Sequence, residues 1–191
     1  NYGVHGAEVS STDSSMAVAY HLAAAQGPAI EETLENSVII LIAVFNPDGN
    51  SRMSAWNHMN GGYVSVSDPE HRLHNTFWPG GRTNHYWFDL NRQWLIIQHP
   101  EPRGWVAKFH EWRPNITVDY HEMGSASTYY FHPGAPERTF PYIPERSMEL
   151  LDLVADRPRS WLDSEQRLYF HEEGFDNYYI GKGSTYPHMH A

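Results

Sequence analysis

Near the start of the chain, a histidine and a glutamate three positions apart could share one metal ion. In His5-x-x-Glu8 the imidazole offers a ring nitrogen and the carboxylate offers one or both oxygens. His121 could complete the set, because it ends a β-branched run, and open α/β sheets place their sites at the carboxyl ends of strands. Two histidines, one carboxylate and an open fourth position are typical of a catalytic zinc. A histidine that is simply hydrogen-bonded at a strand end is the alternative for His121, and Asp119 could orient its ring.

The dipeptide Asn91-Arg92 could bind a carboxylate. It follows a short apolar stretch and closes the sequence Asp89-Leu90-Asn91-Arg92. An arginine presents a planar fork that binds a carboxylate through two hydrogen bonds, and an asparagine amide adds a further donor. A surface salt bridge is the alternative for the same residues.

Composition narrows the classes of partner. The 191 residues carry 13 Lys and Arg against 23 Asp and Glu, a formal net charge of −10, and no run of basic residues. This balance argues against binding to nucleic acid or to anionic lipid. No apolar run reaches the roughly 18 residues of a membrane-spanning helix. Cysteine is absent, which excludes disulfides, thiolate zinc ligands and cysteine nucleophiles but does not fix the cellular compartment.

Helices and strands alternate along the sequence. Apolar residues at helical spacing predict helices over residues 10–26, 102–112, 144–154 and 161–170. Short β-branched or aromatic runs predict strands over residues 37–45, 86–90 and 116–120, the first of them buried on both faces. Asn46-Pro47-Asp48-Gly49 is predicted to be a turn, and residues 50–84 are expected to be irregular and functional.

This alternation predicts an α/β protein with a three-layer α/β/α arrangement. We expect residues 1–191 to form a single domain, because this length suits one hydrophobic core. The chain opens at Asn1 without a methionine and closes at Ala191 without a terminal helix. We therefore expect it to be a fragment of a longer catalytic domain.

Four motifs in this order resemble the zinc carboxypeptidase family of metallopeptidases. They are His5-x-x-Glu8, Asn46-Pro47-Asp48-Gly49, Asp89-Leu90-Asn91-Arg92 and Val118-Asp119-Tyr120-His121. Each motif is weak alone, but four in the family's order and at these separations are specific. Beyond them, the likeness thins to Tyr178-Tyr179-Ile180-Gly181-Lys182-Gly183-Ser184. The family fold, a mixed and mostly parallel sheet between helices, agrees with the predicted layers, although it would be incomplete here.

The resemblance implies a role for each matched residue. Zn²⁺ would be bound by His5, Glu8 and His121. Asn91 and Arg92 would hold the free C-terminal carboxylate of a peptide substrate. The implied reaction is hydrolysis of the C-terminal peptide bond by a water molecule that the metal activates.

Three further roles follow from the same resemblance. The family uses an arginine to polarise the scissile carbonyl, and Arg82 is our first candidate with Arg72 second. Tyr178 or Tyr179 would be the tyrosine that closes over bound substrate. Thr185 falls near the position that selects the terminal side chain, and because it is neutral nothing favours a basic terminal residue.

The general base is the main departure from the family pattern. In the family it is a glutamate on a strand after the glycine-serine stretch, and no glutamate follows Glu173 here. Glu122 adjoins His121, but neighbouring strand residues point to opposite faces of a sheet. We therefore expect the base beyond Ala191, and we expect this chain to lack hydrolytic activity by itself.

Two other functions remain open. Relatives with the same zinc ligands remove acyl groups from amino acids, so an acylated amino acid is an alternative substrate. A protein that binds the carboxylate but lacks the base would be a non-catalytic module for peptide C-termini. The resemblance also leads us to expect a secreted or periplasmic protein.

Overall fold

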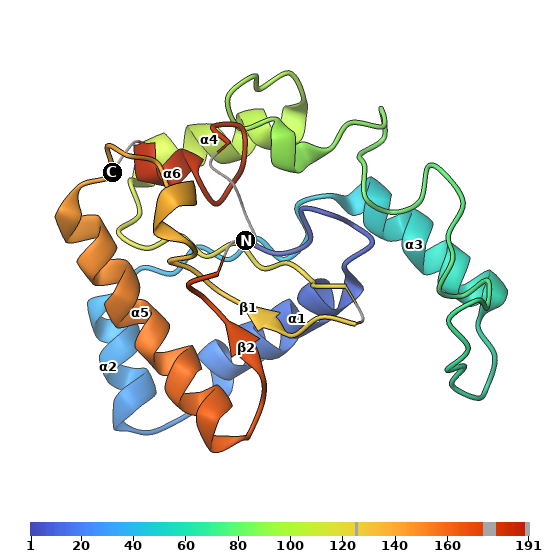
Figure 1. Ribbon diagram of the computed structural model, residues 1–191, viewed down its shortest axis with the longest axis horizontal. Coiled ribbons are helices and arrows are strands. Elements are labelled where there is room, and N and C mark those ends of the chain that lie inside the picture. Colours follow the sequence, from blue (N-terminus) through green and yellow to red (C-terminus); the bar gives the residue numbers. More distant parts are fainter. Residues whose placement is uncertain (125, 174–178, 190–191) are drawn as a thin grey trace.

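The computed structural model describes residues 1–124, 126–173 and 179–189 (Figure 1). Its helices are α1 (Val9–Ala24), α2 (Pro28–Asn36), α3 (Pro47–Asn60), η1 (Leu90–Arg92), α4 (Pro100–Trp112), η2 (Pro136–Arg138), α5 (Glu145–Ser164) and α6 (Tyr186–Met189). Its strands are β1 (Tyr129–Tyr130) and β2 (Tyr169–Phe170), which pair in parallel.

Three of the four predicted helices are confirmed. The helices predicted over residues 10–26, 102–112 and 144–154 are α1, α4 and α5, and each begins within two residues of its predicted start. The separate helix predicted over residues 161–170 is wrong. Helix α5 continues through Pro158 to Ser164, and Tyr169 and Phe170 form β2 instead.

The predictions for residues 46–60 and 86–90 are also wrong. Asn46 caps α3, because its side-chain oxygen accepts a 2.9 Å hydrogen bond from the Gly49 N–H, and a proline occupies the first helical position. Asn46-Pro47-Asp48-Gly49, predicted to be a turn, therefore begins helix α3. The predicted strand at 86–90 is a turn around the buried side chain of Asn84, which accepts two backbone hydrogen bonds.

The other two predicted strands, residues 37–45 and 116–120, are extended segments beside the first residues of the chain. The Tyr2 N–H donates to the carbonyl of Ile42 at 3.0 Å. Tyr2 also forms a parallel bridge with Tyr120. Backbone pairing therefore joins all three segments, although neither predicted segment is assigned as a strand.

The prediction that residues 37–45 are buried on both faces is wrong. Val38 is 74% exposed, and Ile39 and Ile40 are 44% and 42% exposed. Among the described residues, backbone pairing of this segment begins only at Ile42. No strand in the described part of the chain lies beside its first half, so its β-branched side chains face solvent.

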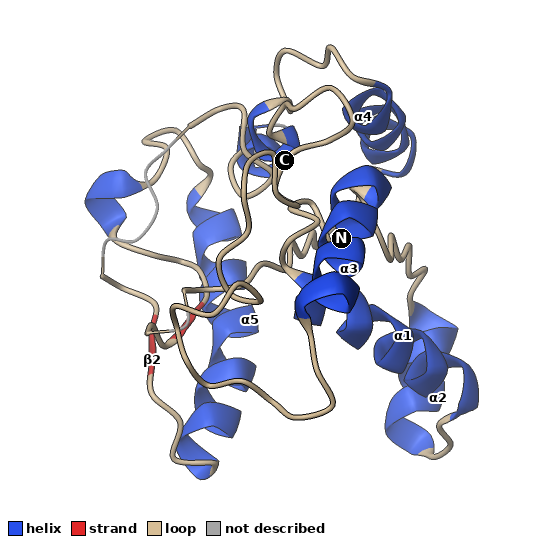
Figure 2. Ribbon diagram, turned by 90° about the vertical axis from the view of Figure 1, so that its right-hand side faces the viewer, coloured by secondary structure: helices blue, strands red, loops and turns tan. Residues whose placement is uncertain are grey.

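Helices lie on both sides of these extended segments. In Figure 2, α5 lies on one side, and α1 and α2 lie on the other. The described residues form an incomplete α/β fold that consists of helices and a small parallel sheet. None of the described helices is long and apolar enough to cross a membrane.

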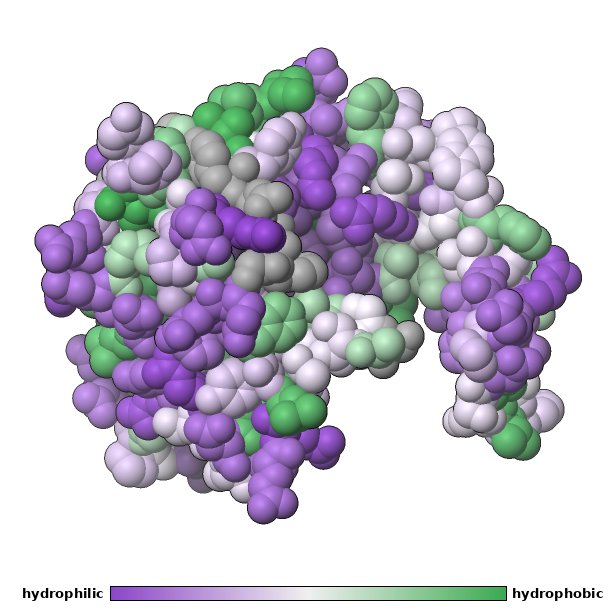
Figure 3. Space-filling model, in the orientation of Figure 1, coloured by the Kyte–Doolittle hydropathy of each residue, from purple (hydrophilic) through white to green (hydrophobic). Residues whose placement is uncertain are grey.

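Helix α3 and the following loop, residues 47–80, form an arm that stands away from the main body (Figures 1 and 3). Inside the arm, the rings of Trp56 and Phe77 meet edge to face, and the Arg72 guanidinium lies within 5.8 Å of both ring centres. At its base, the Arg52 Nη2 donates to the carbonyl of Asn84 at 3.0 Å. The arm is therefore bound to the segment that carries Arg82.

The hydrophobic core joins the first residues of the chain and the end of the 37–45 segment to η1, α4 and α6. Its buried members are Val4, Phe45, Leu90, Trp94, Trp105, Val106, Phe109 and Tyr186. Val4 and Leu90 are both 0% exposed. Their chain neighbours are His5, Asp89 and Asn91, so burial of two apolar side chains holds three polar ones at the edge of the core.

Replacing Gly49 by alanine is expected to destabilise the fold. A Cβ on Gly49 would meet the carbonyl oxygens of Gly81 and Thr83, the latter at 2.9 Å. Backbone atoms cannot move aside as a flexible side chain can, so the expected cost is about 1–3 kcal/mol.

Gly104 supplies the matched control within α4. A Cβ there would meet nothing within 4 Å, and alanine is favoured over glycine inside a helix by roughly 0.5–1 kcal/mol. Chemical denaturation should therefore give shifts of opposite sign for Gly49→Ala and Gly104→Ala. A Gly49→Ala midpoint equal to that of the unmodified protein would contradict the tight packing of α3.

Candidate metal centre

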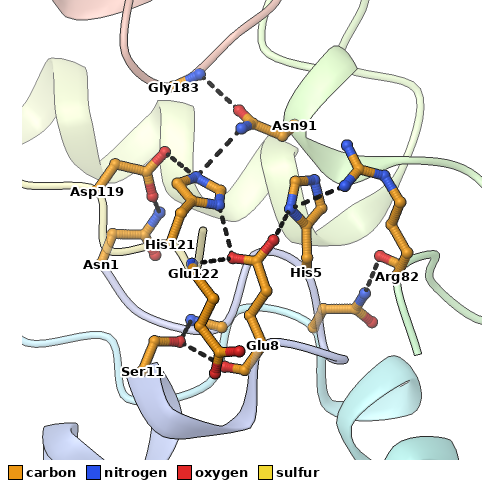
Figure 4. A network of polar contacts seen from close by, with 12 residues as sticks. Asn1, His5, Glu8, Ser11, Arg82, Asn91, Asp119, His121, Glu122 and Gly183 are labelled. Carbon is orange, nitrogen blue, oxygen red and sulfur yellow. Dashed lines mark hydrogen bonds and ion pairs between the residues drawn. The ribbon is translucent and has the colours of Figure 1, made fainter. Parts of the chain in front are cut away.

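The three predicted metal ligands meet at one point (Figure 4). His5 directs its Nδ1 at Oε1 of Glu8 over 2.6 Å, and His121 directs its Nδ1 at Oε2 over 2.9 Å. One ligand atom from each residue lies within 4.8 Å of the other two. The backbone bridge between Tyr2 and Tyr120 explains the meeting, because it brings the segments that carry the two histidines side by side.

A second carboxylate lies behind each histidine. The Nε2 atom of His5 is 3.0 Å from Asp89, and the Nε2 atom of His121 is 3.0 Å from Asp119. Such a partner fixes the orientation and tautomer of the ring and leaves Nδ1 for a metal. The sequence suggested this contact for Asp119 but missed it for Asp89, whose place directly before the buried Leu90 was the available signal.

Hydrogen bonds and charges override the effects of burial in the cluster. Burial alone would raise the pKa of Glu8, but His121 and His5 outweigh it and lower that pKa to about 2. Burial would lower the pKa of His121, but hydrogen bonds to Asp119 and Glu8 raise it to about 10. In the absence of a metal, His121 therefore carries a proton between two carboxylates.

Arg82 reaches the rim of the cluster. Its Nη2 and Nε donate to Asp89 at 2.8 and 3.0 Å, and its Nη1 is 3.4 Å from Nδ1 of His5. Burial would raise the pKa of Asp89, but His5 and Arg82 hold it well below its usual range. Arg72, the second candidate for the same role, is stacked on the aromatic rings of the arm instead.

Asn91 connects the cluster to the last part of the described chain. Its Nδ2 is 3.2 Å from Nε2 of His121, and its Oδ1 accepts a 2.9 Å hydrogen bond from the Gly183 N–H. Gly183 is buried so closely that a Cβ would meet the Asp119 carboxylate at 2.6 Å. The turn around Gly183 therefore packs directly on the groups that orient His121.

The remaining predicted substrate residues lie around this turn. The Arg92 guanidinium donates to the carbonyl of Asn91 at 2.8 Å and lies 5.8 Å from the ring centre of Tyr179. Thr185 lines a pocket on the same turn. Tyr178, the other candidate for the tyrosine that closes over bound substrate, lies outside the described residues. Of the two candidates, only the position of Tyr179 is therefore known.

Glu122 is directed away from the metal ligands. Its backbone N–H donates to Oε2 of Glu8 at 2.9 Å, whereas its carboxylate accepts a 2.6 Å hydrogen bond from the Ser10 N–H in the first turn of α1 (Figure 4). The alternation of side chains along an extended segment explains this division. Glu122 therefore anchors a helix and supports a ligand through its backbone.

The donor set suits zinc. Two imidazole nitrogens and one carboxylate are the ligands of many catalytic zinc sites, and both rings have the outer carboxylates that such sites use. The His5 side chain is 6% exposed, whereas that of His121 is 28% exposed. The cluster is therefore closed on the His5 side and open to solvent on the His121 side.

Zinc affinity is expected to rise with pH. The proton that Asp119 and Glu8 hold on His121, with its pKa raised to about 10, must leave before Nδ1 can bind a metal. Between about pH 6 and pH 8, the apparent association constant should therefore rise roughly tenfold per pH unit. Calorimetry in buffers of different ionisation enthalpy should count about one proton released from His121 per zinc. An affinity that does not change over this range would contradict the protonated state of His121.

The arrangement of helices and extended segments, with two histidines, a glutamate and an arginine at their edge, defines an α/β protein with a candidate metal centre. The family model of the zinc carboxypeptidases matches residues 2–139, and the chain belongs to that family. All four motifs that suggested the family lie within the match, whereas the turn around Gly183 lies after it. Neither the curated proteins nor the solved structures gave a match.

Proposed function

We propose that this protein is a zinc-dependent metallocarboxypeptidase that acts on the C-terminal bond of a peptide. One observation carries the proposal: Asn91, half of the predicted carboxylate-binding pair, is 3.2 Å from the predicted metal ligand His121. A peptide whose free carboxylate is bound by Asn91 and Arg92 would therefore have its last peptide bond beside the metal ligands.

Each remaining polar group then has a chemical role. His5, Glu8 and His121 would hold zinc, which when bound acidifies a water molecule and polarises a carbonyl group. The N–H groups of Arg82 that do not bind Asp89 would donate to the carbonyl oxygen as its negative charge develops. Asp89 would keep the His5 ring in one orientation throughout.

The carboxylate end of the substrate would be held by groups on η1 and the turn around Gly183. Arg92 would bind the two carboxylate oxygens through its planar fork, and the Asn91 amide would add a donor. Tyr179, which lies over the Arg92 guanidinium, would shield this ion pair from water. Asn91 and Arg92 together are called the carboxylate grip. Peptides and acylated amino acids both have the free carboxylate that these two residues would bind.

In this proposal the general base comes from outside the described residues. Each described carboxylate at the site already has a partner: Glu8 and Asp89 bind His5, Asp119 binds His121, and Glu122 is occupied by α1. This observation favours a second candidate function, a module that binds peptide C-termini without cutting them. Binding of a peptide without turnover is the result expected for this second candidate function.

The proposal also includes a single domain and a three-layer arrangement of helices around a sheet. Residues 1–191 would form one zinc carboxypeptidase-like domain, since the carbonyl of Gly181 accepts a 3.1 Å hydrogen bond from Trp94 well inside the family match. The three-layer arrangement around a mostly parallel sheet is supported by the parallel bridge between Tyr2 and Tyr120 and by helices on both sides.

A pair of peptides tests the proposal. The zinc-loaded protein should bind a peptide with a free C-terminus about tenfold or more tightly than the same peptide with a C-terminal amide. Mass spectrometry then separates the candidate activities. Loss of single C-terminal residues indicates a carboxypeptidase, loss of an acyl group a deacylase, and tight binding of intact peptide a binding module. Equal affinity for the two peptides would contradict the carboxylate grip.

A further inference from the structure

The pocket that Thr185 lines adjoins the turn around Gly183. Its polar lining residues are His132, Arg138, Thr139, Ser184, Thr185 and His188. Ser184 and Thr185 follow directly after Gly183, whose N–H donates to Asn91 at 2.9 Å. One short turn therefore connects the predicted carboxylate grip with this pocket, which we name the β1–α6 pocket after the elements on either side of it.

The charge of the β1–α6 pocket is opposite to that of the protein. The chain has a formal net charge of −10, with 23 Asp and Glu. None of the described residues that line the pocket is acidic. Arg138 makes no ion pair with any carboxylate in the described part of the chain. An arginine without a counter-ion, in a hollow without acidic groups, favours an anionic ligand.

Two histidines face the same hollow. The ring centres of His132 and His188 are 6.4 Å apart. Burial, and then the positive charge of His132, lower the pKa of His188. A ligand carboxylate between the rings would offset that repulsion and accept hydrogen bonds from both. The hydroxyl group of Thr185 offers a further donor in the same pocket. The hydroxyl group of Thr139 already donates to the carbonyl of Pro136 at 2.7 Å.

The pocket also has apolar lining residues. Among them are Phe140, Met148 and Leu151, from the loop after η2 and from α5. Apolar residues suit methylene groups, whereas the polar residues of the same pocket suit a carboxylate. A glutamate side chain presents both, because it carries two methylene groups and ends in a carboxylate.

We propose that the β1–α6 pocket receives the side chain of an acidic residue at the C-terminus of the substrate, with Arg138 as its principal counter-ion. The inference rests on the proposed function, because Asn91 and Arg92 must hold the main-chain carboxylate of the same residue. It replaces the open question of the terminal side chain, to which the neutral Thr185 gave no answer, with a preference for glutamate over its neutral isostere glutamine.

Four acylated dipeptides test the inference by their affinity for the zinc-loaded protein. Acyl-Gly-Glu should bind about tenfold or more tightly than acyl-Gly-Gln, since one charge-assisted hydrogen bond is lost with the carboxylate. Acyl-Glu-Leu and acyl-Gln-Leu, with the charge one residue earlier, should bind equally. Arg138→Gln should bring acyl-Gly-Glu down to the affinity of acyl-Gly-Gln. Arg146→Gln, which removes an arginine paired with Glu149 on the surface of α5, should change neither.

The outcomes separate this inference from the function on which it rests. Equal binding of acyl-Gly-Glu and acyl-Gly-Gln, with free acyl-Gly-Leu still preferred over its C-terminal amide, would overturn the acidic pocket and leave the carboxylate grip intact. No preference for the free acid over the amide would overturn both. If Arg138→Gln still binds acyl-Gly-Glu more tightly than acyl-Gly-Gln, the inference is also overturned, because Arg138 would then make no contribution to the preference.

Discussion

The His121→Ala protein is expected to bind zinc at least a hundredfold more weakly than the unmodified protein. His121 supplies one of only three described ligand atoms that lie within 4.8 Å of one another. Loss of a direct ligand should cost more than the roughly 10–100-fold that removal of an outer partner costs. Metal analysis after dialysis against a defined zinc concentration would show about one zinc per chain falling to none.

Two further variants make this result specific. Asp119→Asn retains the ligand and weakens only its orientation, so its affinity for zinc should fall by about 10–100-fold. His21→Ala removes an exposed histidine from α1, and its affinity should not change. The graded order of the three variants is the expected signature of a centre built on His121. Zinc retained at full affinity by His121→Ala would place the metal elsewhere.

The sequence located the candidate site better than it located the elements that carry it. Polar residues next to fully buried ones, such as His5 after Val4 and Asn91 after Leu90, have their positions set by the core, and motif order was enough to find them. Asp89 was missed as a partner of His5 because 84 positions separate the two residues. Burial of the neighbouring Leu90 and Val4 in one core brings the two residues together, and that packing is a property of the fold.

The errors in the fold have local physical causes. Asn46 and Pro47 favour a turn and the start of a helix equally well, and the side-chain bond to Gly49 decides for α3. The apolar run from Val38 predicted burial on both faces, but burial depends on neighbouring strands that the run itself does not specify. Apolar content therefore predicted an extended conformation correctly and its environment wrongly.

Replacing Arg92 by methionine is expected to abolish the preference for peptides with a free C-terminus. Methionine keeps an unbranched apolar stem under Tyr179 but removes the guanidinium. A bidentate ion pair of this kind contributes about 1.5–3 kcal/mol, so the affinity for the free acid should fall roughly 10–150-fold. Arg92→Lys keeps a charge without the planar fork and should lie between the two. Fluorescence anisotropy with labelled peptides would measure all three affinities.

The affinity for the amidated peptide shows whether the weaker binding of the free acid by Arg92→Met comes from a lost ion pair or from a structural defect. Arg92 also donates to the carbonyl of Asn91, so its removal could loosen η1 and weaken binding without any role in holding a carboxylate. A structural defect of that kind would weaken the free acid and the amide by the same factor. Loss of a direct ion pair would weaken only the free acid and bring it down to the affinity of the amide. Because the two peptides differ only at the terminal group, the ratio of their affinities isolates the contact between Arg92 and that group.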